Sequence, residues 1–261
     1  MSFGALSFVF DGIPSERMGL YLLNTESKET TITGGAKLTL YTDKTNKSYK
    51  HNLLGVSEDE PLEFKLTFGS LNPLSRYDIS AIQKWLFGHK EYKKLQIIQD
   101  DMVGVYYNCI LDDPEITAIG NIPYMFECTV ICDSPFAWED EKVYEYEIGA
   151  LPKTIKLYNT SDINDYTYPL VEFTSKTSGN TVSLINLSND NRETKIEGLA
   201  LNEKVTMNNE FQILTTSTDL GRLKNFNKNW FELVRGENVI QVSGNIDTLK
   251  ITYANARRIG G

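Results

Sequence analysis

Very few side chains in this sequence have the type and spacing that catalysis requires. The chain contains only two histidines: His51 lies in a polar stretch, and His89 follows a predicted helix. A partly positive imidazole interacts favourably with the C-terminal end of a helix dipole, so a capping or surface role is favoured over catalysis for His89. The motifs of zinc proteases, nucleophile elbows, phosphate loops, dinucleotide folds and calcium loops do not occur. The sequence therefore predicts no catalytic residue, no metal site and no cofactor.

Two pairs of adjacent aspartates, Asp100-Asp101 and Asp112-Asp113, are the candidates for a carboxylate dyad. In a retaining glycosidase the two carboxyl groups lie about 5 Å apart and face one bond. Neighbouring residues on a strand point to opposite faces, so neither pair has this arrangement. Asp100-Asp101-Met102 and Asp113-Pro114 are typical of turns, where aspartate is a favoured residue. We therefore expect no enzyme.

Sugar binding is the more serious alternative for the C-terminal half. Carbohydrate modules present exposed aromatic faces beside Asn, Asp and Arg, and Trp230, Tyr166, Tyr168 and Arg192 supply these residue types. Trp230 precedes Phe231 in an alternating run, so one of the two faces the core, and a tryptophan in a sandwich is more often packed than bound to ligand. The candidate glycan contacts are Trp230, Arg192 and Tyr168.

The three cysteines, Cys109, Cys128 and Cys132, are an odd number without the spacing of a disulfide framework. On one strand, Cys128 and Cys132 would have Cα atoms about 13 Å apart, beyond the roughly 7 Å that a disulfide spans. We expect all three to be free, buried and apolar in role.

Composition and charge narrow the class of protein. The chain has 261 residues, of which 41% are hydrophobic and 23% charged, and its 14 Tyr and 12 Phe favour β structure. The net charge of −9 and the scattered basic residues argue against nucleic-acid binding, although solubility alone also explains such a charge. The sequence contains no run of about 18 apolar residues, so it predicts no membrane span. The N-terminal stretch lacks a basic n-region and a long apolar run, so we expect no signal peptide and synthesis in a cytoplasm.

The first half of the chain predicts one helix among antiparallel strands. Ser75 and Asp78 have the spacing of a capping box, Ile79, Ile82, Trp85 and Leu86 recur at helical spacing, and Gly88 suits the position after the helix. Alternating apolar residues predict strands over 62–68, 95–98, 103–111 and 126–132. Residues 30–52, with the strand-like run 38–42, are either an arm that pairs with a neighbouring subunit or an ordinary exposed hairpin.

The second half predicts a β-sandwich. Residues 139–147 are an edge strand or a connector, and a boundary near Gly149 divides the chain into domains 1–148 and 149–261. Short apolar-alternating runs, separated by turn residues, then follow at 155–158, 170–174, 182–187, 194–196, 205–207, 211–214, 230–234, 239–242 and 249–253.

Four stretches, in order along nearly the whole chain, resemble the distal tail (Dit) family of siphophages. They are the opening Ser7-Phe8-Val9-Phe10-Asp11-Gly12-Ile13; Trp85-Leu86-Phe87-Gly88 followed by Lys94-Leu95-Gln96-Ile97; Tyr124 to Trp138, which contains Cys132-Asp133-Ser134-Pro135-Phe136-Ala137-Trp138; and Trp230 to Asn238 followed by Val242-Ser243-Gly244. The third is the most specific, and none is a catalytic fingerprint. The resemblance implies an N-terminal belt domain that closes a hexameric ring and a C-terminal galectin-like or jelly-roll β-sandwich.

The same resemblance implies a non-enzymatic virion protein of the tail tip, or baseplate. In the family the ring is a hub between the tail tube, the tape-measure and tail-associated lysin or fibre proteins, and the receptor-binding proteins used in host adsorption. DNA passes through the ring without being bound, and no membrane is involved. A contractile particle or tailocin with a similar hub is a variant of this hypothesis. The alternative function is a lectin-like adhesin that contacts host cell-wall glycans.

Overall fold

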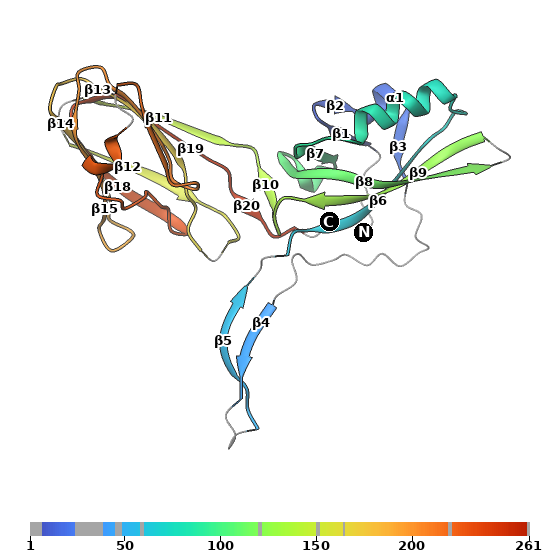
Figure 1. The fold of residues 1–261 in the computed structure, drawn as a ribbon, viewed down its shortest axis with the longest axis horizontal. Helices are drawn as coiled ribbons and strands as arrows, with labels where there is room; N and C mark the ends of the chain where they lie inside the picture. Colours follow the sequence, from blue (N-terminus) through green and yellow to red (C-terminus); the bar gives the residue numbers. More distant parts are fainter. Residues whose placement is uncertain are drawn as a thin grey trace. The chain divides into compact units, whose positions relative to one another are not determined.

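The computed structural model contains two compact units built almost entirely of antiparallel strands (Figure 1). It describes residues 7–23, 39–44, 49–57, 60–119, 122–149, 152–163, 165–218 and 221–259. The first unit comprises Met1–Glu139 and Arg257–Gly261, and the second comprises Asp140–Ala256. One α-helix occurs in the described ranges. The predicted mainly-β fold with a single short helix is confirmed.

The first unit is organised by a nine-stranded sheet in the order β2-β1-β7-β8-β9-β6-β3, with β10 beside β8 and β20 beside β10. The strands are β1 (Ser7–Phe10), β2 (Ile13–Pro14), β3 (Leu20–Leu22), β6 (Glu63–Ser70), β7 (Lys93–Ile98), β8 (Val105–Ile119), β9 (Ile122–Cys132), β10 (Ala137–Glu139) and β20 (Ala256–Arg257). Two 3-10 turns accompany them, η1 (Ser15–Met18) and η2 (Asp100–Met102). Along β6 the side chains of Phe64, Leu66 and Phe68 are buried, so this strand has the dry face that its alternation predicted.

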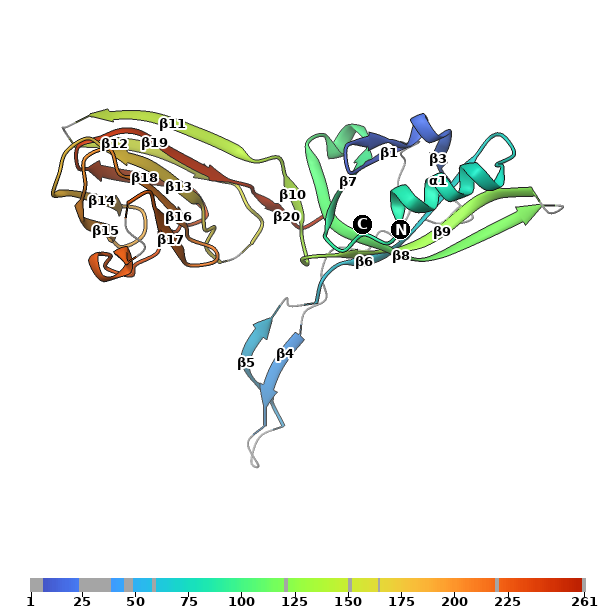
Figure 2. The same cartoon turned by 45° about the horizontal axis from the view of Figure 1, so that its top comes forward.

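Helix α1 (Arg76–Leu86) packs its apolar side on this sheet (Figure 2). The predicted capping box is present: Ser75 N–H donates to Asp78 Oδ2 at 2.8 Å, and Asp78 N–H donates to Ser75 Oγ at 3.2 Å. Gly88, one residue beyond the cap, has φ 77°, the left-handed conformation that glycine adopts without a Cβ penalty. Trp85 stacks on Phe8 and donates from Nε1 to the Phe10 carbonyl at 3.1 Å, which ties the helix to β1.

Strands β4 (Thr39–Asp43) and β5 (Asn52–Ser57) form a separate two-stranded hairpin. They cover part of the segment expected to be an arm or an exposed hairpin; residues 30–38 and 45–48 of that segment lie outside the described ranges. The two strands pair antiparallel, with Leu40 opposite Val56 and a register shift between Tyr41 and Thr42.

The second unit is a sandwich of two sheets. A five-stranded sheet has the order β11 (Lys142–Gly149), β19 (Ile246–Tyr253), β13 (Leu170–Ser175), β16 (Lys204–Asn208) and β17 (Ile213–Thr216). A four-stranded sheet has the order β12 (Lys153–Asn159), β18 (Gly236–Ser243), β14 (Asn180–Asn186) and β15 (Arg192–Leu199), and the 3-10 turn η3 (Arg222–Asn225) follows β17. Inward residues of both sheets, among them Leu157, Val171, Leu184 and Ile251, share one core.

The division between the units differs from the expected boundary after residue 148. Strand β11 is an edge strand of the sandwich, paired with β19 from Lys142 to Gly149, so the second unit begins at Asp140. The last residues belong to the first unit, because β20 pairs with β10, the Arg257 guanidinium binds the Glu139 carboxylate, and Ile259 packs on the first core.

Two other expectations are corrected. Asp113-Pro114 is not a turn between elements; it lies inside β8, at a bulge opposite β9, where Asp113 adopts φ 51°. Residues 230–234 are not a strand of either sheet; the only ladder pairing described in this stretch is the single bridge between Leu233 and Thr167. Their backbone instead finds partners in the side chains of Asn186 and Asn209, which lie far away in the sequence, and of Asn238, which lies nearby.

Candidate functional site

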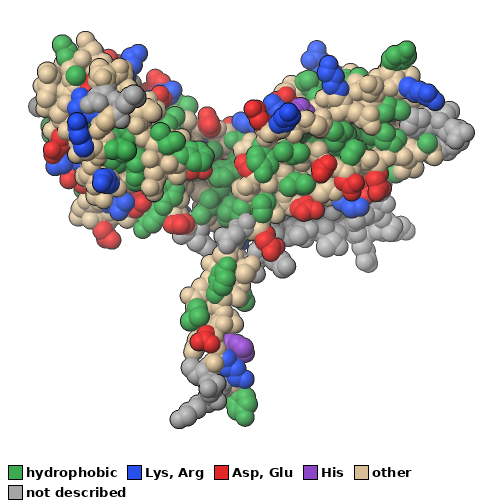
Figure 3. Space-filling view, in the orientation of Figure 1, with side chains coloured by type: hydrophobic (Ala, Val, Ile, Leu, Met, Phe, Trp, Pro, Cys, Tyr) green, Lys and Arg blue, Asp and Glu red, His purple; other side chains and the backbone are tan. Residues whose placement is uncertain are grey.

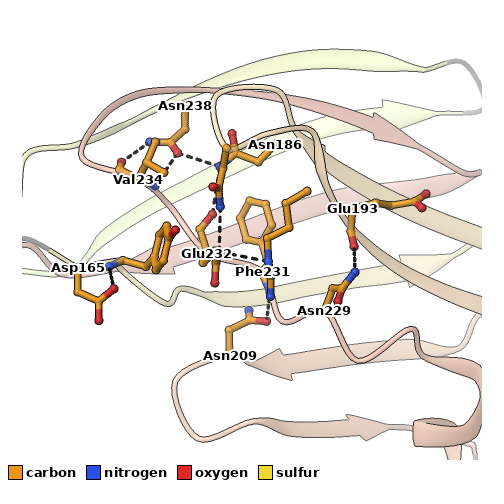
Figure 4. Close-up of polar contacts among 12 residues, drawn as sticks. Asp165, Asn186, Glu193, Asn209, Asn229, Phe231, Glu232, Val234 and Asn238 are labelled. Atoms are coloured by element: carbon orange, nitrogen blue, oxygen red, sulfur yellow. Dashed lines mark hydrogen bonds and ion pairs between the residues drawn. The ribbon is translucent and has the colours of Figure 1, made fainter.

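The segment 227–234 of the sandwich is irregular, and buried asparagines hold it in place (Figure 4). Asn209 Oδ1 accepts the Phe231 N–H at 2.7 Å, and Asn186 Nδ2 donates to the Glu232 carbonyl at 3.1 Å. Asn238 accepts the Val234 N–H at 2.9 Å and donates to the Val234 carbonyl at 2.8 Å. An asparagine amide offers a donor and an acceptor together, so it can replace a neighbouring strand for one residue.

One bridge fixes which side chains of this segment face outward. Thr167 and Leu233 exchange both backbone hydrogen bonds, at 3.0 and 2.9 Å, and Leu233 is fully buried. Neighbours along an extended chain point to the opposite face, so Tyr166, Tyr168 and Glu232 lie on the outer side. The rings of Tyr166 and Tyr168 are edge to face, with centroids 6.4 Å apart, and each residue is 38% exposed.

Glu232 is a nearly buried carboxylate, 8% exposed. Its Oε1 accepts from Asn189 Nδ2 at 2.9 Å and lies 3.2 Å from Arg192 Nε. Burial, followed by the negative charges of Asp165 and Glu232, raises the pKa of Tyr168, while Arg192 lowers it. The structure therefore brings two of the three candidate glycan contacts, Arg192 and Tyr168, into one charged and aromatic cluster.

The third candidate, Trp230, is half-buried and packs against the sandwich core. Its ring meets Phe226 edge to face, with centroids 4.8 Å apart. Its neighbour Phe231 is buried, which agrees with the prediction that one of these two residues faces the core. Sequence reasoning missed Glu232 and Asn189. The residues next to Glu232 in the sequence give no sign of this contact, because Asn189 reaches the carboxylate from the turn between β14 and β15 only in the folded chain.

The residues weighed for catalysis have structural surroundings. His89 Nε2 lies 2.7 Å from the Trp85 carbonyl at the end of α1, in the position of a C-terminal cap. Asp112 and Asp113 are exposed on β8. Across the parts of the chain that the structure describes, no group of His, Cys, Asp and Glu could hold a metal ion.

The cysteine prediction is confirmed: Cys109, Cys128 and Cys132 are buried and free. Cys109 lies opposite Cys132 in the β8–β9 register. Burial raises the pKa of Cys128 and Cys132 to about 12, with Glu127 and Asp133 respectively adding to the effect, and burial raises the pKa of Cys109 further. The thiols are therefore protonated and act as small apolar side chains.

The hairpin β4–β5 carries the most unusual exposed surface. Leu40 is 58% exposed and Leu54 is 69% exposed, and Tyr41, Leu53 and Val56 are exposed as well. Apolar side chains are visible along the hairpin in Figure 3. An isolated two-stranded hairpin is only marginally stable in water. A hairpin with exposed apolar side chains is stabilised when a partner buries them, and such a patch marks an interaction site.

A free strand edge lies on β6 of the same unit. The Leu23 N–H donates to Thr67 O at 2.9 Å, so odd-numbered residues of β6 direct their backbone groups away from β9. Strand β3 pairs only with residues 68–70, which leaves the backbone groups of Glu63 and Lys65 without a strand partner among the described residues. Such an edge is a template for another strand.

The described residues include no helix long and apolar enough to cross a membrane.

Comparison with known proteins gives a consistent family and fold. A family model described as the phage tail protein N-terminal domain matches residues 3–134, and one described as the phage tail C-terminal domain matches residues 136–253. No curated protein matches the sequence. The solved Dit protein of phage SPP1, described as a paradigm of hub adsorption apparatus in phages that infect Gram-positive bacteria, aligns with a TM-score of 0.68 at 12% identity, over 95% of this chain and 98% of that one.

Two structures of the phage p2 baseplate in its activated conformation are also similar. The chain with Ca aligns with a TM-score of 0.51 at 10% identity, over 90% of each chain. The chain with Sr aligns with a TM-score of 0.52 at 10% identity, over 96% of this chain and 98% of that one. At these identities the likeness is one of fold, and the expected distal-tail fold is confirmed over nearly the whole chain.

Proposed function

The chain belongs to the phage tail protein family and carries both of its domains, and from this premise we propose that it is the distal tail hub of a phage tail tip. The observation that carries the proposal is the likeness of fold to a Dit protein over 95% of this chain and 98% of that one. In this role the protein is a structural part of the virion and not an enzyme.

We further propose that copies of the chain close into a ring, a hexamer by family resemblance. The hairpin β4–β5 offers exposed apolar side chains, and the β6 edge at Glu63 and Lys65 offers backbone groups that have no strand partner among the described residues. Backbone hydrogen bonds between the hairpin of one copy and β6 of the next copy would supply both register and affinity. The hairpin of one copy would dock on a different surface of the next copy, so the contact is head to tail, and such a contact forms a ring when the rotation between copies closes.

The net charge of −9 supports a ring that DNA traverses without binding, because a negative wall does not attract phosphates. The proposed neighbours are the tail tube and tape-measure proteins on one side, and the lysin or fibre and receptor-binding proteins on the other. The proposed location is the virion tail tip.

The test is the solution mass of the purified full-length protein by light scattering over a concentration series. We expect a discrete species at six times 29.6 kDa, or a pair of such rings. Replacing residues 39–57 by a short flexible linker should give a folded monomer with an unchanged melting temperature. A monomer at every concentration in the intact chain would contradict the ring.

A second variant addresses the edge. Lys65→Pro removes an N–H that faces away from β9, so it blocks a docking strand without removing a bond to β9. Lys65→Ala is the matched control, since it removes the same exposed side chain, which pairs with Glu127, and keeps the N–H. The proposed contact predicts that only Lys65→Pro lowers the solution mass. Equal masses for the two variants would place the interface elsewhere.

A further inference from the structure

We propose that the outer face around Tyr166, Tyr168 and Glu232 binds a neutral hexose unit of a glycan. This site is separate from the ring contact, because it lies in the second unit and uses none of the hairpin or β6 residues. The name tyrosine ribbon is used here for residues 165–168 and 232–234.

The tyrosine ribbon holds two aromatic rings in a fixed geometry. The backbone exchange between Thr167 and Leu233 anchors both segments, and the buried Leu233 prevents the ribbon from turning over. The two rings meet at 62°, so they line two sides of a corner and leave their remaining faces to solvent. The apolar C–H face of a pyranose stacks on such a ring, while the phenol hydroxyl at the rim can bond a sugar hydroxyl.

The polar groups beside the rings are oriented before any ligand arrives. Asn186 holds the Glu232 backbone, while Asn189 and Arg192 hold its Oε1. The other carboxylate oxygen, Oε2, has no partner among the described residues. Burying a carboxylate is costly unless its oxygens are satisfied, so a free oxygen in this position is a strong acceptor for a ligand hydroxyl. The Arg192 side chain, 39% exposed, adds donors next to it.

Charge decides which glycan fits. The cluster contains one guanidinium, of Arg192, and two carboxylates, of Glu232 and Asp165, and Asp165 is fixed by accepting the Tyr166 N–H at 2.8 Å. A phosphate- or carboxylate-bearing polymer is repelled by this excess of negative charge. A neutral hexose, which needs both donors and acceptors, matches the set.

The test is titration calorimetry of the full-length protein against neutral trisaccharides of glucose, galactose and rhamnose, with a glycerol-phosphate teichoic acid as the anionic probe. We expect millimolar or tighter binding of at least one neutral sugar. Tyr168→Ala should weaken this binding about tenfold, because it removes the stacking surface. Glu232→Gln should weaken it similarly, and Tyr168→Phe, which keeps the ring, should retain most of it.

The matched control is Tyr92→Ala, which removes an exposed tyrosine from the first unit. It should bind sugar as the unmodified chain does. Absence of binding to every neutral sugar overturns the proposal, and so does teichoic acid binding that persists in Tyr168→Ala. Solution mass, measured on the same samples, should be unchanged by Tyr168→Ala, so failure of this site is distinguishable from failure of the ring.

Discussion

The guanidinium of Arg222 binds the buried carboxylate of Glu203 through two nitrogens, with Nε 2.9 Å from Oε1 and Nη2 2.7 Å from Oε2. The same carboxylate accepts the Ala200 N–H at 2.7 Å, and Arg222 Nη1 donates to the Gly198 carbonyl at 2.8 Å. The pair therefore fastens η3 to the turn between β15 and β16, a part of the sandwich with little apolar burial of its own.

Removing one partner of this pair should strongly destabilise the sandwich. Arg222→Ala leaves the Glu203 carboxylate buried without its counter-charge, which costs about 3–5 kcal/mol. Denaturant unfolding followed by tryptophan fluorescence measures the loss. Arg235→Ala, at an exposed arginine, is the control and should change the unfolding free energy by less than about 0.5 kcal/mol. Similar values for the two variants would show that the pair contributes no net stability.

Glu203 should also make stability depend on acid pH. Burial by itself raises the pKa of this carboxyl, but the hydrogen bonds from Arg222 and from the Ala200 N–H outweigh it and lower the pKa to about 2 from an ordinary value of 4.5. A depressed folded-state pKa contributes stability that is complete above 4.5 and is lost as the pH falls towards 2. Glu203→Gln should therefore reduce the pH dependence of the unfolding free energy between pH 4.5 and 2. Parallel pH profiles for the two proteins would contradict this.

The three thiols should be unreactive in the folded protein. Because the pKa values of Cys128 and Cys132 are raised to about 12, the thiolate that attacks a disulfide reagent is almost absent at pH 8. A colorimetric thiol assay should find no rapidly reacting cysteine in buffer and all three after denaturation. Rapid native labelling of any one of them would show that the β8–β9 region opens.

Asn238 should be critical for the irregular segment that precedes β18. It is fully buried and bonds both backbone groups of Val234 as well as Asn186. Asn238→Ala leaves these groups unsatisfied, at a cost of about 1–3 kcal/mol each. Asn72→Ala, at an exposed asparagine of the first unit, is the comparison in thermal melts. A melting temperature equal to that of the comparison variant would refute the role given to Asn238.

Apolar residues of the hairpin should affect assembly but not folding. Leu54→Ser changes a side chain that is 69% exposed, so the unfolding free energy should stay within about 0.5 kcal/mol while the ring weakens. Leu71→Ser, at a leucine outside the hairpin that is 79% exposed, should leave the ring intact. Light scattering at a fixed concentration separates the two, and equal masses would remove the hairpin from the interface.

Local signals predicted the elements whose stabilising contacts lie close in sequence. The capping pair Ser75 and Asp78 marked the start of α1, and the alternation in residues 62–68 marked β6, because each pattern is complete within one element. Residues 230–234 alternate in the same way but form no strand of either sheet, since Asn186, Asn209 and Asn238 take the place of neighbouring strands. Asn186 and Asn209 lie 46 and 22 positions from the residues that they bond, so nothing near Trp230 in the sequence could reveal these two partners.

The same limit applies to the candidate sugar contacts and the division of the chain. Arg192 and Tyr168 were identified by residue type alone, whereas Glu232, which links them, became visible only through the Thr167–Leu233 bridge. The return of Arg257 to Glu139 joins residues 118 positions apart, a pairing that no local pattern contains.

That return has a consequence for proteolysis. The chain leaves the first unit through β10 and re-enters it through β20, which pairs with β10, so the sandwich is an insertion with two covalent connections. A protease that cuts either connection leaves the sandwich attached through the other, and only a second cut releases it.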